Sequence, residues 1–337
     1  MKKILSLVLT LVLIFTFAAC SNTPADVDSE IASSDETVNY ADTNVYVLSG
    51  PTGIGAANLK DKADKKETDV NYNITVVAQP DEVVSKISNG EADIAAIATN
   101  LAAKLYNKTQ GGITILAVNT LGVLNVVTPE GVEVDSLQDL KGKKVYATGQ
   151  GSNPEYVINY LLEKNGIDKD KDLTLEYKTE GTELLTVWSS DPTAVIISPQ
   201  PVATTLTIQF PTSKIAIDLT DEWDKVSTDS ALMMGCVVVR NEFLKNNKAT
   251  VDKFLEDYNE SITKANQDIE TTATLCETYG IVAKAAVAKK AIPNCNICFI
   301  KGNEMKTKLS GYLSVLFDAD KTSVGGKLPA DDFYYEG

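Results

Sequence analysis

The sequence predicts an α/β protein of two lobes that are joined by two crossings of the chain. Apolar runs typical of strands alternate with segments of helical periodicity, and this pattern restarts near residue 122. A glycine-containing turn between a strand and a helix occurs once in each half, at 49–55 and 148–153. Each lobe is therefore expected to contain a mixed or parallel sheet flanked by helices.

The first 19 residues have the pattern of a secretory signal peptide. Two lysines precede an apolar run that ends at Phe17, and Cys20 follows two alanines. The run is shorter than the 20 or so residues that a transmembrane helix needs. The segment before Cys20 is similar to the lipobox of bacterial lipoproteins, which implies cleavage before Cys20 and attachment of acyl chains (palmitate) to it. An ordinary signal peptide with an incidental Cys20 is the alternative.

Residues 20–42 are polar and acidic, so they cannot bury enough apolar surface to fold and are expected to form a tether. The expected domain organisation is a signal peptide at 1–19, a tether at 20–42, a first lobe at 43–121 and 238–337, and a second lobe at 122–237.

The first lobe is expected to be built from parallel β-α-β units. Strands are predicted at 44–49, 73–78, 92–98, 113–119 and 123–129, the last of them leading into the second lobe. A helix begins near Ala56, after the first glycine turn, and another occupies 80–90, where Pro80 starts it and Gly90 ends it.

The second lobe repeats this order. Strands are predicted at 143–148, 194–198, 214–219 and 233–240. The helix after the second glycine turn starts at Pro154 and ends before Gly166. The chain from Asn241 onward has mostly helical periodicity.

Composition excludes several classes of function. The formal net charge is −15, and it becomes −17 once the two lysines of the signal segment are removed, so nucleic acids and anionic membrane surfaces are not expected partners. The chain has no histidine, which removes serine and cysteine triads and imidazole metal sites. Arg240 is the one arginine, so any bound anion must be met by backbone amides, lysines or hydroxyls.

No metal site or cofactor is expected. Cys295 and Cys298 form a C-x-x-C pair, but only Cys236 and Cys276 are available besides them and Cys20. A lone C-x-x-C is compatible with half a zinc site, a redox pair or two buried thiols. Export permits disulfides, but spacing does not reveal a pairing.

The two glycine turns do not match nucleotide-binding loops. Gly50 and Gly55 have P-loop spacing, yet Ala56 and Ala57 stand where a P-loop has lysine and a hydroxyl residue, and Asn58 takes the third glycine position of a dinucleotide fingerprint. Each turn is either a tight strand-to-helix connection or half of a ligand site. A matched pair, one in each lobe, favours a ligand site between the lobes.

Several segments resemble type 2 solute-binding proteins of ABC importers, in the subgroup that binds sulfonates, nitrate and thiamine-pyrimidine precursors. The resemblance rests on "ISNGEADIAAIATN", "SLQDLKGKKV", "GQGSNPEYVINYLLEKNGI", "SPQPVATT" and "CVVVRNEFLKNN". It extends from about residue 44 to the C-terminus and implies the type 2 periplasmic binding protein fold, with two hinge crossings.

This resemblance implies ligand-binding positions at the strand ends that face the cleft. The residues carried over are Ser49, Pro51, Thr52, Gly53, Thr99, Asn100, Asn119, Thr120, Gly149, Gly151, Ser152, Ser198 and Gln200. Loop amides and hydroxyls are expected to hold a polar head, and Ile54 or an aromatic side chain to contact a flat body. Trp188, Trp223 and the methionines at 233–234 are expected in the core.

The implied function is capture of a small polar, aromatic or anionic molecule and its delivery to an ABC permease and its ATPase. The protein is expected to be a monomer on the extracytoplasmic face of the membrane, held only by its lipid anchor. The alternatives are a lipoprotein sensor or adhesin on the same fold, and an enzyme. Relatives that synthesise the thiamine pyrimidine consume an active-site histidine, which this chain lacks.

Overall fold

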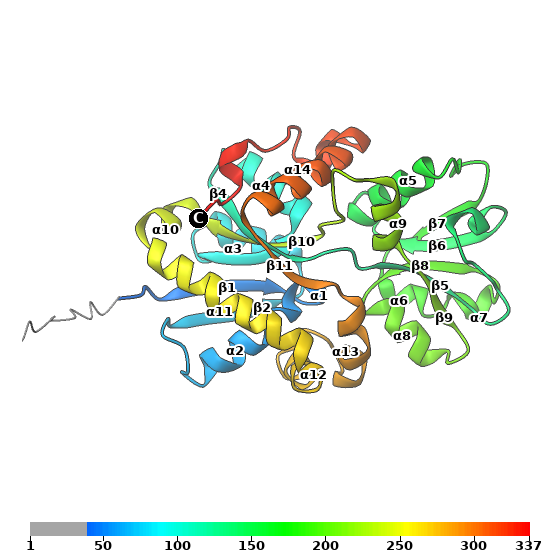
Figure 1. Ribbon diagram of the computed structural model, residues 1–337. Coiled ribbons are helices and arrows are strands. Elements are labelled where there is room, and N and C mark those ends of the chain that lie inside the picture. The colour runs from blue at the N-terminus through cyan, green and yellow to red at the C-terminus, as the bar shows by residue number, and fades with distance from the viewer. Residues whose placement is uncertain (1–38) are drawn as a thin grey trace, which may run out of the picture. The chain divides into compact units, whose positions relative to one another are not determined.

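The computed structural model describes residues 39–337 and contains two mixed β-sheets flanked by helices (Figure 1). The signal peptide, Cys20 and most of the predicted tether lie outside the described residues. The expected two-lobed α/β architecture is confirmed.

The first sheet has the strand order β11-β4-β10-β3-β1-β2. Its strands are β1 (Thr43–Leu48), β2 (Tyr72–Val77), β3 (Ile94–Ala98), β4 (Ile113–Thr120), β10 (Gly235–Arg240) and β11 (Ile297–Ile300). β1, β2 and β3 pair in parallel, whereas β10 pairs antiparallel with both β3 and β4. All eight residues of β4 are buried, as expected for a strand covered by helices on both faces.

The second sheet has the order β7-β6-β8-β5-β9. Its strands are β5 (Leu124–Thr128), β6 (Lys144–Thr148), β7 (Thr174–Lys178), β8 (Val195–Pro199) and β9 (Lys214–Asp218). β6 pairs in parallel with β7 and β8, and β5 runs antiparallel to β8 and β9. In the first sheet β10 and the edge strand β11 run against the other strands, and in the second sheet β5 does, where simple β-α-β units were expected.

Helices cover the faces of both sheets (Figure 1). The first lobe begins with α1 (Pro51–Ile54), α2 (Ala57–Asp64), α3 (Pro80–Ser88) and α4 (Thr99–Lys108). The second contains α5 (Asn153–Lys164), α6 (Gly181–Leu184), α7 (Val187–Ser190), α8 (Val202–Gln209) and α9 (Leu219–Val226). The remaining helices are α10 (Asn241–Asn246), α11 (Lys248–Gln267), α12 (Ile269–Thr278), α13 (Ala285–Ala291) and α14 (Gly302–Ala319).

The chain crosses between the sheets twice, once between β4 and β5 and once between α9 and β10. β10 pairs with β3 from Gly235 onward, so residues 235–237 pair within the first sheet although the expected boundary places them in the second lobe. The strands at Thr174–Lys178 and Ile297–Ile300 have no counterpart among the sequence predictions. β7 is a partly exposed edge strand with two charged residues, and β11 has only four residues, so neither has a strong apolar signal.

The C-terminal helix α14 also joins the lobes, by packing against the second lobe and not by a further crossing of the chain. Met305, Leu309 and Leu316 are fully buried on one face of α14, as their spacing along a helix requires. The ring of Tyr312 lies 5.5 Å from that of Trp223 in α9, in an edge-to-face arrangement. Trp188 and Trp223 are both buried, which confirms their expected place in the core.

Arg240 is used within the first lobe. Its guanidinium lies 2.8 Å from a carboxylate oxygen of Asp93, whose second oxygen accepts a hydrogen bond from the backbone N–H of Asn44. Both Asp93 and Arg240 lie at the end of the sheet opposite the carboxyl ends of the parallel strands, since each stands beside the first residue of β3. The one guanidinium of the chain is therefore already paired away from the expected ligand cleft.

Candidate functional site: the cleft between the two sheets

A cavity of about 390 Å³ lies where the carboxyl ends of strands from both sheets meet. Each strand end leads into a helix or a crossing segment, so backbone and side chains from both lobes reach it. The lining comprises Leu48, Pro51, Thr52, Pro80, Ala98, Asn100, Leu101, Lys104, Thr120, Val123, Ser152, Asn153, Pro154, Pro199, Gln200 and Met234. Most of the wall is apolar, with polar groups at a few points, which is typical of small-molecule sites.

The cavity lining includes some of the residues that were carried over from the resemblance and omits others. Those that line it are Pro51, Thr52, Asn100, Thr120, Ser152 and Gln200. The others, which do not line it, are Ser49, Gly53, Thr99, Asn119, Gly149, Gly151 and Ser198.

Three of the side chains outside the lining are occupied with structural hydrogen bonds. The Thr99 hydroxyl donates to the carbonyl of Met233 at 2.7 Å. Asn119 donates to the carbonyl of Thr52 at 3.0 Å and to the hydroxyl of Tyr258 at 2.8 Å. Ser198 is fully buried, and its hydroxyl lies 3.3 Å from the carbonyl of Pro199, to which it donates. The bonds of Asn119 and Thr99 hold α1 and the segment before β10 in place beside the cleft.

The first glycine turn was expected to offer backbone N–H groups to a ligand, but several of these N–H groups already have acceptors. Ser49 N–H donates to Val77, Gly50 N–H to Ile281, and Gly53 N–H to the carbonyl of Gly50. Ile54 is 1% exposed and belongs to the core of the first lobe, so it does not contact a ligand in the cleft. Met234, expected only to pack, lines the cavity.

Two longer helices instead direct their N-termini at the cavity. α4 begins at Thr99 and α5 at Asn153, and neither has a side-chain N-cap hydrogen bond. First-turn amides of an α-helix lack intrahelical acceptors and carry the positive end of the helix dipole. One helix belongs to each lobe, so each lobe directs the positive end of a helix dipole at the cavity. At α5 the carboxylate of Glu155, which accepts a hydrogen bond from the Gly151 N–H, offsets part of this charge, and at α4 the Thr99 N–H already donates to the carbonyl of Met234.

Lys104, one turn into α4, is the only charged residue among those that line the cavity. No sequence argument singled it out. The available signal was its spacing: it stands four residues after Asn100 and thus on the same face of the helix. Hydrogen bonds from Thr322 and Tyr156 lower the pKa of Asp320, and the ammonium of Lys104 lowers it further.

Beside the cleft, Tyr156 of α5 donates a hydrogen bond to Asp320 at 2.9 Å. Asp320 follows α14 and also accepts from Thr322, so this bond joins the second lobe to the C-terminal segment. Burial, together with the hydrogen bond to Asp320, raises the pKa of Tyr156 to about 12. The hydroxyl is therefore protonated, and able to donate, at neutral pH.

We expect Tyr156→Phe to favour separation of the lobes because it removes this bond while keeping the ring. The ligand-free variant should have a larger radius of gyration by small-angle scattering and a midpoint of thermal unfolding lower by a few degrees. Tyr160→Phe, one turn along α5 and without a hydroxyl hydrogen bond within residues 39–337, is the matched control. Equal behaviour of the two variants would contradict a role for the bond.

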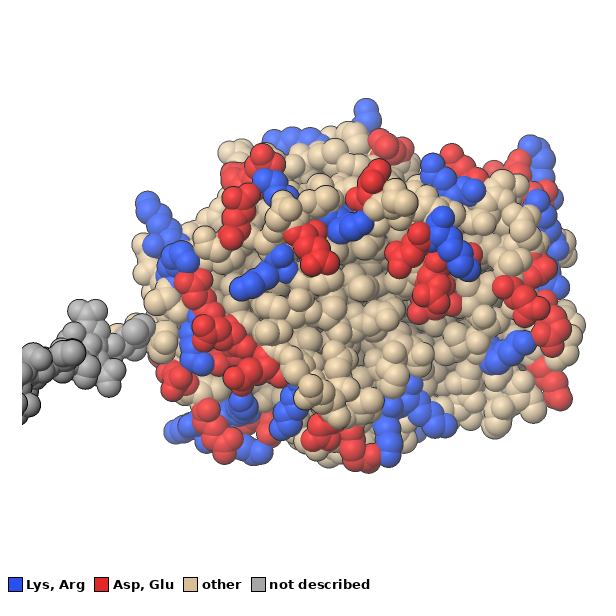
Figure 2. Space-filling view, in the orientation of Figure 1, with Lys and Arg blue, Asp and Glu red and all other residues tan. Residues whose placement is uncertain are grey.

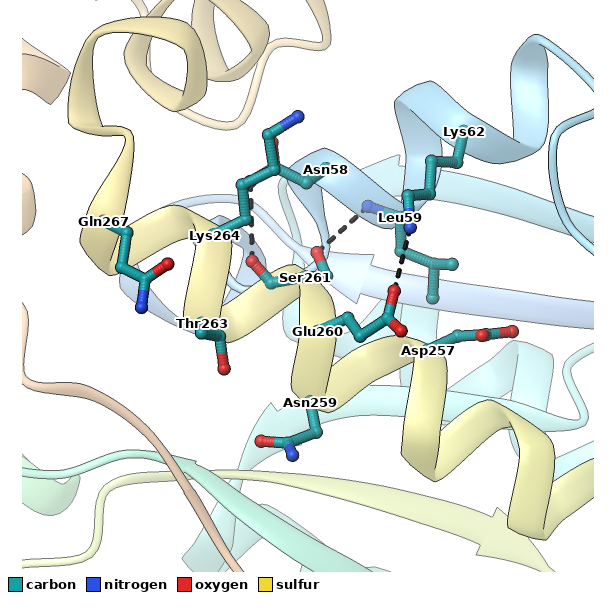
Figure 3. A pocket seen from close by; sticks show the side chains of 10 residues that line it. All are labelled: Asn58, Leu59, Lys62, Asp257, Asn259, Glu260, Ser261, Thr263, Lys264 and Gln267. Atoms are coloured by element: carbon teal, nitrogen blue, oxygen red, sulfur yellow. Dashed lines mark hydrogen bonds and ion pairs between the residues drawn. The ribbon is translucent and has the colours of Figure 1, made fainter.

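A second cavity of about 380 Å³ lies over α2 and α11 in the first lobe (Figure 3). Two of the four charged residues that line it pair with each other: Lys62 lies 2.9 Å from Glu260. The hydroxyl of Ser261 accepts from the amide of Leu59 at 3.0 Å. None of the carried-over residues lines it, so the cleft between the sheets is the better candidate site.

Within residues 39–337, no group of three or more cysteine, aspartate or glutamate side chains is placed to hold a metal ion. The cysteines at 236, 276, 295 and 298 are all free thiols. Burial raises the pKa of Cys276 and of Cys298 to about 12. These thiols are therefore protonated at neutral pH. Among the same residues, no helix is both long and apolar enough to span a membrane.

Acidic and basic side chains are interspersed over the face that Figure 2 shows, around a central surface of uncharged residues. The charges on this face therefore form no patch of one sign, and the residues that line the cleft include no acid.

Comparison with known proteins agrees with this architecture. A crystal structure of an ABC transporter protein from Parabacteroides distasonis has a TM-score of 0.74 at 24% identity, over 88% of this chain and 99% of that one. The periplasmic aliphatic sulphonate binding protein of Escherichia coli has a TM-score of 0.68 at 12% identity, over 87% and 92%. The ligand-binding component of an ABC-type import system from Staphylococcus aureus, solved with zinc bound, has a TM-score of 0.64 at 16% identity, over 87% and 96%.

These likenesses confirm the type 2 periplasmic binding protein fold. Among curated protein sequences, none matches the chain. Residues 66–270, more than half of the sequence, match the family described as NMT1/THI5 like. The chain is a member of the NMT1/THI5-like family.

Proposed function

We propose that the protein is the solute-binding component of an ABC import system, and that it binds a small monoanion with an apolar body. The observation that carries the proposal is the lining of the interlobe cavity: Lys104 is its only charged residue, and the uncapped N-termini of α4 and α5 face it. Helix N-termini and a lysine together favour a negative head group. The apolar wall favours a hydrocarbon or aromatic body.

The charge of the ligand follows from the charge of the site. Divalent anions bound in proteins are generally met by several cations or by bidentate arginine. Arg240 is paired with Asp93 at the far end of the sheet, which leaves one ammonium and two helix dipoles. A carboxylate or sulfonate matches this supply better than sulfate or phosphate. The names of the sulphonate-binding relatives agree with this class of ligand.

The mechanism is binding by closure. A ligand that contacts the first lobe through Asn100 and Lys104 and the second through Ser152 and Gln200 bridges both, so it binds the closed arrangement more tightly than the open one. The closed protein is then recognised by a permease with its ATPase. Attachment through acylated Cys20 at the extracytoplasmic face keeps the receptor near that permease.

Two alternatives use the same fold. A lipoprotein sensor would close on the ligand in the same way but signal instead of delivering it. It is distinguished by deletion of the neighbouring permease gene, which stops ligand uptake only for an importer. An enzyme of the type that consumes its own active-site histidine is disfavoured because the chain has no histidine.

A thermal-shift screen of the mature, non-lipidated chain tests the proposal. At 100 times its dissociation constant a ligand adds about 2.7 kcal/mol to the free energy of unfolding, which visibly raises the melting temperature. We expect shifts with aliphatic and aromatic sulfonates or carboxylates, smaller shifts with sulfate and phosphate, and none with matched amines. Scattering should show compaction with the same compounds. Stabilisation by amines alone would contradict the anionic ligand, and no compaction with any compound would contradict the receptor role.

A further inference from the structure

Gln200 has a side-chain amide with one end fixed and the other without a partner. The residue follows β8 in the second lobe, lines the interlobe cavity and is 2% exposed. Its oxygen Oε1 accepts from the hydroxyl of Thr204 at 2.7 Å and from the backbone N–H of Thr204 at 3.3 Å. Its nitrogen Nε2 is buried and has no hydrogen-bond partner within residues 39–337.

The bonds to Thr204 decide which end of the amide is available. A flip of the Gln200 amide would place the NH₂ group against the backbone N–H of Thr204, which can only donate, so that bond would be lost and two donors would face each other. The Thr204 hydroxyl could then only accept, so the observed orientation is the one that satisfies both groups of Thr204. The available end is therefore a donor. A buried donor without an acceptor costs about 1–3 kcal/mol, so its presence in the wall of a cavity points to an acceptor that arrives with the ligand.

Asn153, on the same lobe, provides a contrast. It also lines the cavity, is 5% exposed, and its Oδ1 has no partner among the described residues. Within those residues no hydrogen bond fixes its amide in one orientation, so it can present either end to a ligand. Of these two amides, only that of Gln200 discriminates between acceptor and donor atoms.

We propose that Gln200 is a specificity-determining residue that requires an acceptor atom on the ligand, and that Thr204 is the residue that positions it. This inference rests on the proposed solute-binding function and assigns the chemistry of one contact in that site. The ligand class it selects has a carboxylate, sulfonate or carbonyl oxygen directed at the second lobe. Amidinium and ammonium groups are rejected at the same point, because two donors would face each other.

The test compares benzoate and benzenesulfonate with benzamidine by calorimetry on the mature chain. The three share a ring and differ in whether the head accepts or donates. In Gln200→Glu the oxygen that faces Thr204 is kept, and the donor becomes a negative acceptor. Thr204→Val removes the hydroxyl that holds the amide, and Thr204→Ser restores it. Thr205→Val is the matched control, since the Thr205 hydroxyl donates to the carbonyl of Pro201 and not to Gln200.

We expect the parent protein to bind an acceptor-headed compound at least about tenfold more tightly than benzamidine, the worth of one good hydrogen bond. Gln200→Glu should reverse this preference, and Thr204→Val should reduce the ratio severalfold. Thr204→Ser and Thr205→Val should keep the ratio of the two affinities within about twofold of the parent value. A twofold change corresponds to about 0.4 kcal/mol, which is less than the thermal energy. Rescue by serine separates positioning from a merely structural role of the threonine.

Several outcomes overturn the inference. The first is a parent protein that prefers benzamidine, and the second is an affinity ratio that Gln200→Glu leaves unchanged. The third is a Thr204→Ser variant that behaves like Thr204→Val. The fourth is no binding of benzoate or benzenesulfonate at about 10 mM, where binding free energies are only a few kcal/mol. If Gln200→Glu fails to fold, the Thr204 pair decides. If the protein closes around benzamidine, this inference is wrong but the solute-binding function stands. If it closes around none of the screened compounds, the solute-binding function itself is wrong.

Discussion

Replacing Lys104 with glutamate is expected to abolish binding of anionic ligands. The substitution removes the one cation among the residues that line the cavity and places a carboxylate beside the N-termini of α4 and α5. A hydrogen bond to a charged group contributes about 1.5–3 kcal/mol, so Lys104→Met alone should weaken binding about 10- to 100-fold. The like charge in Lys104→Glu should increase the loss further. Calorimetry with the best monoanion from the thermal-shift screen measures both.

Lys108→Glu is the matched control for this prediction. Lys108 lies one turn further along α4, is exposed and does not line the interlobe cavity. It carries the same change of charge at nearly the same place in the chain, so it reproduces any general effect of net charge on binding. If the two glutamate variants lose affinity equally, the loss comes from long-range charge and Lys104 does not contact the ligand.

Gly53→Val is expected to destabilise the fold. The glycine turn alone suggests that a side chain at Gly53 blocks the ligand while the fold stays intact. In the structure a Cβ atom at Gly53 would lie 2.3 Å from the backbone oxygen of Leu48 and 3.3 Å from a side-chain carbon of Ile281. Because a backbone atom cannot move aside as a flexible side chain can, we expect a loss of about 3 kcal/mol in the free energy of unfolding.

Chemical denaturation of Gly53→Ala and Gly53→Val checks this expectation. Gly131→Ala is the control, because Gly131 has a positive φ of 78° and no atom within 4 Å of the added Cβ. It reports the cost of placing an alanine at a left-handed position without a steric clash, about 1–2 kcal/mol. A Gly53→Val protein with the stability of the parent and no ligand binding would instead support the simpler idea that this turn touches the ligand directly.

The sequence was sufficient for the fold because most strands are apolar runs bounded by turn residues. "IAAIA" and "ITILAVNT" are buried along nearly their whole length and have no competing pattern. The direction of β10 was not predictable from its own residues. Whether it runs with or against β3 depends on which side of the sheet the chain returns to after the second lobe, and no local propensity encodes that return.

The candidate site was only partly predictable for a related reason. A strand end can be located from sequence, but the direction of each side chain after it depends on how the following helix is set. Thr99 and Asn100 are the first two residues of α4, where successive side chains point about 100° apart. Thr99 donates to the carbonyl of Met233, whereas Asn100 lines the cavity. Lys104 is one of two lysines on α4, and Lys108 is exposed, so its place in the cleft depends on how α4 packs. The partner of Gln200 lies four residues later, at Thr204, and this spacing was available in the sequence.

The position of β10 in the first sheet has a consequence for how the chain folds. This strand is inserted between β3 and β4, yet it is synthesised only after the whole second lobe. The first lobe therefore cannot complete its sheet on a nascent chain that lacks these residues, and it must wait for a contact between distant parts of the sequence. Topologies with many such contacts fold slowly. The unfolded chain therefore persists for longer after synthesis than that of a protein whose strands pair with their sequence neighbours.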